Sequence, residues 1–262
     1  MSDRTRQIVV TLSAVFMIVG TLFGTGVIGT RVEEASGGSL SATATLIAPA
    51  VPAFSIWSVI YLGLIAYVIW QWLPANTTSP RLRSTGLLAA LSMVLNAVWL
   101  LVTQVGWLWV SVVVILGLAV TLGELVRRLG TSVGVSTVER VVVDGTYGLY
   151  LGWVSVATAA NITATLVDSG VNPEIGIAQW LAVAVVAVAA AIGVVLARTL
   201  GGRIGVALAM AWGLSWIAVG RLTNEPASSV VGVAAILAAV VVAGAAVLVR
   251  ARGGRTAAVA TA

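Results

Sequence analysis

The sequence over residues 87–123 is LLAALSMVLNAVWLLVTQVGWLWVSVVVILGLAVTLG, and it contains no charged side chain. A single helix of that length would extend about 55 Å at 1.5 Å per residue. The hydrocarbon core of a bilayer is only about 30 Å thick. The chain must therefore turn inside the stretch, near Gln104-Val105-Gly106. Residues 87–123 thus predict two membrane-spanning helices joined by a tight hairpin.

Similar apolar segments lie on both sides of this hairpin. Each is close to the length of about 20 residues that a spanning helix needs. The breaks between them combine charged residues with Gly or Pro, as helix ends do. The predicted spans are residues 7–29, 53–73, 85–104, 107–126, 141–166, 176–197, 203–221 and 228–249. We therefore expect an all-α fold, a polytopic membrane helix bundle of about eight transmembrane helices.

The composition supports a membrane protein and excludes several kinds of site. The chain is 60% hydrophobic and 9% charged, whereas soluble domains carry roughly 25% charged residues. It has no Cys, which excludes disulfides, thiolate metal sites and cysteine nucleophiles. It has no His, the commonest haem and metal ligand, and no Lys, which a retinal Schiff base requires. We expect no required cofactor.

All 14 basic residues are arginines, and they are scattered between the apolar segments. Binding of nucleic acid needs a clustered basic patch on a soluble face, so no nucleic-acid partner is expected. Cytoplasmic loops of membrane proteins carry an excess of arginine. With eight spans and a cytoplasmic N-terminus, only Arg31 and Arg221 fall outside, and the other twelve lie inside. The sequence therefore predicts a multi-pass protein of the cell (plasma) membrane with both termini cytoplasmic.

The first apolar run follows Arg4 and Arg6, as the apolar region of a signal peptide would. It extends for about 20 residues, which is longer than a signal peptide needs, and no small-residue cleavage site follows it. We therefore expect this segment to be an uncleaved spanning helix.

Ten tryptophans stand out beside only three phenylalanines. Tryptophan is enriched at membrane interfaces, where the indole N–H reaches the polar layer. Five tryptophans lie at predicted span ends and fit this belt: Trp70, Trp72, Trp107, Trp109 and Trp180. The other five lie deeper: Trp57, Trp99, Trp153, Trp212 and Trp216. Because a deep indole needs an acceptor for its N–H, we expect these to face protein or a cavity.

Helical spacing places polar and aromatic side chains on common faces. Asn96 and Trp99 are three residues apart, and so share a face of their helix. Two further stripes are Trp57 with Tyr61, and Tyr150 with Trp153, Ala157 and Asn161. An amide facing lipid is costly, so both asparagines should point inward. Two interpretations stay open: the amides hold helices together, or they line a cavity in the outer half of the bundle.

These residues carry a resemblance to a known family. Residues 49–72, PAVPAFSIWSVIYLGLIAYVIWQW, resemble the second-helix signature of the TspO/MBR family, the translocator proteins or tryptophan-rich sensory proteins. Leu95-Asn96-Ala97-Val98-Trp99 matches the family's third-helix Leu-Asn-x-x-Trp. Tyr150-Leu151-Gly152-Trp153, followed by Ala157 and Asn161, matches its fifth-helix motif. The Trp-Tyr that is usual in the family's first loop is absent from residues 31–48.

The resemblance implies a division of the chain. Residues 1–167 are similar to a five-helix transmembrane core, residues 168–250 would be three additional spans, and residues 251–262 a short basic cytoplasmic tail. It also implies homodimers, although added helices could block that contact. Family members bind tetrapyrroles, sterols and aromatic molecules between their helices. The implied ligand-binding residues are Trp57, Tyr61, Asn96, Trp99, Tyr150, Trp153, Ala157 and Asn161.

We therefore expect a sensory or ligand-binding membrane protein that holds a flat hydrophobic molecule, with membrane lipids and this ligand as its partners. A porphyrin is a candidate ligand. The alternative is a small-molecule transporter using the added helices, although its only candidate buried charges, Asp144 and Arg221, lie near span ends. No acid, base and nucleophile share a depth, so the sequence favours a protein that is not an enzyme. Light-driven porphyrin breakdown, proposed for the family, stays open.

Overall fold

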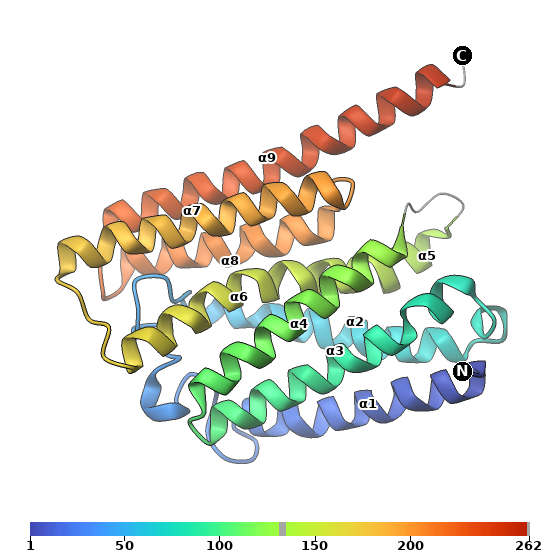
Figure 1. Ribbon diagram of the computed structural model, residues 1–262, viewed down its shortest axis with the longest axis horizontal. Helices are drawn as coiled ribbons and strands as arrows, with labels where there is room; N and C mark the ends of the chain where they lie inside the picture. Colours follow the sequence, from blue (N-terminus) through green and yellow to red (C-terminus); the bar gives the residue numbers. More distant parts are fainter. Residues whose placement is uncertain (131–134, 261–262) are drawn as a thin grey trace.

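The computed structural model describes the backbone of residues 1–130 and 135–260 and the side chains of residues 1–130 and 135–253. Every named element in these residues is a helix (Figure 1). Eight segments are long and apolar enough to cross a membrane, which confirms the predicted all-α bundle. The main helices are α1 Asp3–Gly24, α2 Ile56–Trp72, α3 Pro80–Gln104, α4 Leu108–Leu129, α6 Thr146–Asp168, α7 Ile175–Thr199, α8 Ile204–Thr223 and α9 Ser229–Ala260.

The predicted hairpin inside residues 87–123 is confirmed. Helix α3 ends at Gln104 and α4 begins at Leu108, so only three residues connect them. Gly106 has a φ of 75°, a left-handed conformation that a glycine adopts without strain. The turn between α3 and α4 thus lies at the position that the sequence predicted.

Several helices extend beyond the predicted spans at their polar ends. Helix α1 begins at Asp3 because the side chain of Ser2 accepts a hydrogen bond from the Thr5 amide. Helix α3 begins at Pro80, and proline is favoured at a first helical position because its missing N–H costs nothing there. Helix α9 continues to Ala260, through most of the segment predicted as a tail. Residues 261 and 262 lie outside the described residues.

The fifth span is built from three consecutive elements. A short α5, Thr137–Glu139, is followed by the π-helix η4, Arg140–Gly145, and then by α6. Together they extend the span to Thr137–Asp168, compared with the predicted 141–166. Residues 131–134, before this span, lie outside the described residues.

The helices pack as a series of neighbours. Helix α1 lies against α3, α3 against α4, and α4 against α6, with α2 contacting α1 and α6. On the other side α6 packs against α8, which packs against α9, and α9 against α7 (Figure 1). Helices α6 and α8 are in close contact, so the packing marks no boundary between them. The division into a core over 1–167 and an addition over 168–250 stays a prediction.

Glycines bring α6 and α8 into close contact. A Cβ placed on Gly148 would lie 3.3 Å from the Cα of Gly205, and one on Gly152 would lie 2.2 Å from the carbonyl oxygen of Val206. Backbones approach this closely only where side chains are small, which is a common way to pack helices in lipid. The three C-terminal helices are therefore anchored on the face of α6 next to Trp153.

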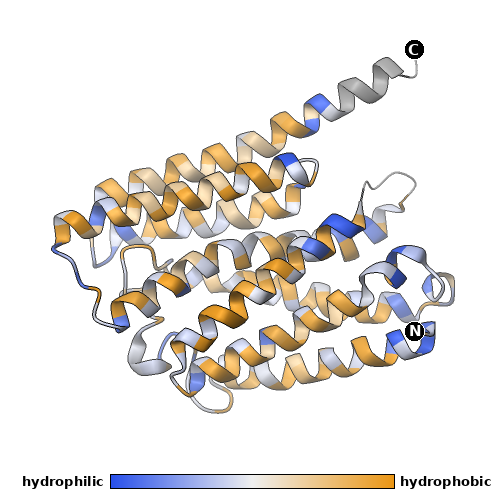
Figure 2. Cartoon of the chain, viewed as in Figure 1, coloured by the Kyte–Doolittle hydropathy of each residue, from blue (hydrophilic) through white to orange (hydrophobic). Residues whose placement is uncertain are grey.

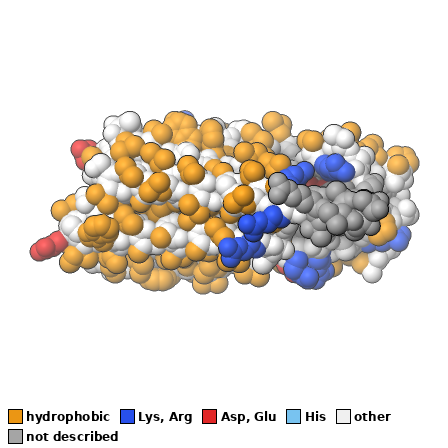
Figure 3. Space-filling view, turned by 90° about the horizontal axis from the view of Figure 1, so that it is seen from above, with side chains coloured by type: hydrophobic (Ala, Val, Ile, Leu, Met, Phe, Trp, Pro, Cys, Tyr) orange, Lys and Arg blue, Asp and Glu red, His pale blue; other side chains and the backbone are white. Residues whose placement is uncertain are grey.

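Strongly hydrophilic residues gather at the end of the bundle that also holds the N-terminus (Figure 2), and they include the ion-paired arginines Arg6, Arg81, Arg83 and Arg203. Asp144 accepts ion pairs from Arg81 at 2.9 Å and from Arg203 at 2.6 Å, and Arg81 also pairs with Glu139 at 2.6 Å. Asp144 thus links α3 and the start of α8 to the fifth span. It is one of the two charged residues on which the transporter alternative depended. Seen from above, hydrophobic side chains are spread over the part of the face that lies away from the arginines, as a lipid-facing surface requires (Figure 3).

The contact between α6 and α8 provides a test of the packing. We expect Gly152→Ala to lower the free energy of unfolding by roughly 1–3 kcal/mol, because its Cβ would overlap a backbone carbonyl that cannot move freely. Thermal unfolding in detergent measures the change. The control is Gly123→Ala in α4, whose Cβ would meet nothing within 4 Å. Equal midpoints for the two variants would contradict the close packing.

Candidate functional site

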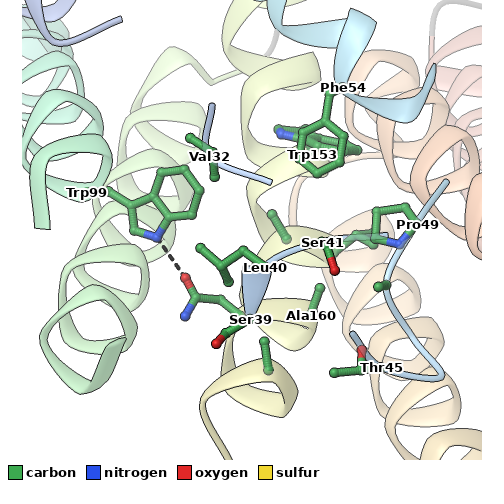
Figure 4. A pocket seen from close by; sticks show the side chains of 15 residues that line it. Val32, Ser39, Leu40, Ser41, Thr45, Pro49, Phe54, Trp99, Trp153 and Ala160 are labelled. Atoms are coloured by element: carbon green, nitrogen blue, oxygen red, sulfur yellow. Dashed lines mark hydrogen bonds between the residues drawn. The ribbon is translucent and has the colours of Figure 1, made fainter. Parts of the chain in front are cut away.

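A cavity lies between α3, α6 and the connection over residues 25–55 that joins α1 to α2 (Figure 4). The space in it that a water-sized sphere can occupy is about 50 Å³, and all the space between its atoms, including the open mouth, is about 540 Å³. We call residues 32–54 the roof, because they cover the cavity. The roof contributes Val32, Ser39, Leu40, Ser41, Thr45, Ala48, Pro49 and Phe54, and the helices contribute Trp99, Trp153, Val156, Ala157, Ala160, Asn161 and Ala164.

Trp99 and Asn161 form one wall of the cavity. The indole Nε1 of Trp99 donates a hydrogen bond to Oδ1 of Asn161 at 2.7 Å (Figure 4). The Asn161 amide nitrogen donates in turn to the hydroxyl of Ser111 at 2.9 Å, so this side chain joins α3, α4 and α6. Both interpretations of this asparagine therefore hold, since it links helices and also lines the cavity.

Trp153 lies on the other side of the cavity, beneath Phe54 (Figure 4). Its side chain is 2% exposed, and its ring meets Phe54 and Trp57 edge to face, with centroids 5.7 and 6.2 Å away. Its Nε1 has no hydrogen-bond partner among the described residues. An unpaired buried donor costs about 1–3 kcal/mol. The buried indole of Trp153 therefore carries an unsatisfied hydrogen-bond donor.

An aromatic layer lies behind Trp153, away from the cavity lining. Trp57 stacks on Tyr61 with centroids 5.2 Å apart and meets Tyr150 edge to face. The hydroxyl of Tyr61 donates to Oδ1 of Asn96 at 3.1 Å, and the hydroxyl of Tyr150 donates to a backbone carbonyl of α3. Asn96 is fully buried, as expected, and connects α2 to α3.

The structure thus places the eight predicted site residues in two groups. The cavity is lined by Trp99, Trp153, Ala157 and Asn161. The aromatic layer contains Trp57, Tyr61, Asn96 and Tyr150, which are outside the cavity lining, and Trp57 contacts the lining residue Trp153. Their role in ligand binding stays a prediction.

A family model described as TSPO-like protein matches residues 7–248. The chain belongs to the TSPO-like family. The match includes α7 and α8 and reaches into α9, and so extends well beyond the segment in which the helix motifs occur. No curated protein and no solved structure matches this TSPO-like chain in the comparisons made.

The motifs of the TSPO-like protein did not identify most of the roof. Eight of the lining residues belong to the connection between α1 and α2, of which only Pro49 and Phe54 lie in a motif. The length of this connection is a signal, since connections longer than about 12–15 residues in compact domains are usually functional. Ala160 and Ala164 were also missed, although helical spacing places them beside Ala157 and Asn161.

The bond between Trp99 and Asn161 predicts a stability effect. We expect Asn161→Ala to lower the free energy of unfolding by roughly 1–3 kcal/mol, because it leaves the buried Trp99 N–H without an acceptor. Unfolding in mixed detergent measures this change. The exposed Asn172→Ala is the control and should change stability by less than about 0.5 kcal/mol. The cost should shrink in a Trp99→Phe background, and equal costs in the two backgrounds would contradict the pairing.

Proposed function

We propose that this TSPO-like protein is a sensory or carrier protein that binds a flat hydrophobic molecule, tetrapyrrole, sterol or lipid-like, in the cavity under the roof. The observation that carries this proposal is an apolar cavity flanked by two indoles, in which Trp153 keeps an unpaired N–H. Pockets for small molecules are typically lined by hydrophobic and aromatic side chains with a few polar groups that fix orientation.

The polar groups of the cavity suggest how such a ligand would be oriented. Trp153 supplies a free donor, while the N–H of Trp99 is already bonded to Asn161. The hydroxyl of Thr45 is buried and has no partner among the described residues. Because the sequence has no His, a porphyrin here would be held by stacking and hydrogen bonds and not by an axial imidazole.

The size of the cavity adds a requirement to the proposal. A cavity volume of about 50 Å³ has room for a few water molecules, whereas drug-sized ligands occupy pockets of roughly 300–1,000 Å³. A tetrapyrrole would fit only if the roof moved away from α6. The proposed binding therefore includes displacement of the roof.

Binding can be tested with protoporphyrin IX, measured by quenching of tryptophan fluorescence in lipid nanodiscs. We expect Ala157→Leu to raise the dissociation constant at least about tenfold, because the longer side chain fills the cavity without altering either indole. The control is Ala187→Leu on the exposed face of α7, which should bind as the unaltered protein does. Quenching that is equal in all three proteins would place the porphyrin elsewhere.

We also propose that the protein lies in the cell membrane with both termini cytoplasmic, because the arginine-rich end would then face the cytoplasm. The absence of native cysteine makes this testable with single introduced thiols. An impermeant maleimide should label Asn172→Cys, between α6 and α7, in intact cells. It should label Thr199→Cys, at the end of α7, only after permeabilisation. The reverse pattern would overturn the proposed orientation.

A further inference from the structure

Helix α8 contacts the roof along a set of hydrogen bonds to its backbone. Trp212 Nε1 donates to the carbonyl of Ala53 at 2.9 Å, and the Ala50 amide donates to the carbonyl of Trp216 at 3.1 Å. One turn further along, Arg221 donates to the carbonyls of Thr45 and Ala42, each at 2.9 Å. Four bonds from one helix therefore hold residues 42–53, the second half of the roof.

Arg221 is the most unusual member of this set. Its side chain is 1% exposed, and among the described residues it forms no ion pair, so two carbonyl oxygens receive its charge. A buried charge is costly unless it is hydrogen-bonded. The bonds to the roof therefore stabilise the charge of Arg221 as well as the position of the roof. Breaking them leaves the guanidinium without acceptors and two roof carbonyls without donors.

The first half of the roof is held by other elements. The hydroxyl of Ser36 donates to the carbonyl of Thr103 at 2.7 Å, and that of Ser39 donates to Asp168 at 2.5 Å. These partners are at the ends of α3 and α6, two of the helices that carry the family motifs. The second half, which includes Thr45, Ala48 and Pro49 of the cavity lining, depends on α8.

We propose that α8 is a clasp that keeps the roof closed over the cavity, and that Arg221 is the positioning residue that sets how fast the roof opens. The part of this proposal that concerns ligand exchange rests on the proposed function, whereas the closing of the roof does not. Opening separates Arg221 from the carbonyls of Ala42 and Thr45 and turns the Thr45 side chain away from the cavity. Closing restores both bonds.

The closing of the roof can be tested without any ligand. Thr45 is 5% exposed, and Thr45→Cys adds the only thiol of the full chain. We expect a small maleimide to modify this thiol at least about tenfold faster when Arg221→Met is also present, because opening then breaks no bonds to a charged donor. The matched control, Arg198→Met, removes an exposed arginine at the other end of the bundle and should leave the rate unchanged.

A second variant keeps the test decisive if Arg221→Met does not fold. Trp212→Phe retains an aromatic ring but loses the donor to Ala53, and should accelerate modification of Thr45→Cys by a smaller factor. Its control is Trp180→Phe, which alters a 69% exposed indole on α7. Unchanged rates in folded Arg221→Met and Trp212→Phe proteins would overturn the clasp.

Ligand kinetics separate the clasp from the binding site. With protoporphyrin IX in nanodiscs, Arg221→Met should raise the association and dissociation rate constants together, with a smaller change in their ratio, and Arg221→Lys should restore part of the slow exchange. A change in the dissociation rate constant alone would identify Arg221 as a ligand contact and overturn its positioning role. Faster thiol modification in a protein that never binds protoporphyrin would support the clasp and count against porphyrin as the ligand.

Discussion

The structure depends on one constraint, which is that backbone polar groups near the hydrocarbon of a membrane must find partners within the protein. The spanning helices meet it internally, but the connection over residues 25–55 is mostly irregular and cannot. Gln104 at the end of α3 and Trp212 and Arg221 of α8 donate to its backbone carbonyls instead. This bonding fixes an otherwise free segment over Trp99 and Trp153, and a cavity results where helices alone would leave an open groove.

The number of helices could be predicted because the length of each apolar segment can be compared directly with the thickness of the bilayer. The charge-free stretch over 87–123 is too long for one crossing, and the turn at Gly106 is where the sequence indicated. Helix ends were less predictable because hydropathy marks only the part of a helix in hydrocarbon. Pro80 and Thr137 begin helical structure in polar sequence, where capping and local hydrogen bonds decide.

The candidate site was predictable along each helix but not between helices. Spacing placed Trp153, Ala157 and Asn161 on one face of α6, and all three line the cavity. Spacing also placed Trp57 and Tyr61 on one face of α2, yet their stacked rings lie behind Trp153 and do not line the cavity. How α2 is rotated relative to α6 depends on packing between helices, which the sequence of one helix does not determine. The roof has no period at all, and its position follows from bonds to residues far along the chain.

Those distant bonds have a consequence for how the protein is made. Arg221 follows its partner Thr45 by 176 residues. At a synthesis rate of about 5–20 residues per second, the carbonyl of Thr45 precedes its donor by roughly 9–35 s. Helices α3 and α6 are made within that interval, so in its last part both walls exist while the second half of the covering segment still lacks its anchor. A hydrophobic molecule in the surrounding lipid would have its easiest access to the nascent protein then, before the last helices arrive.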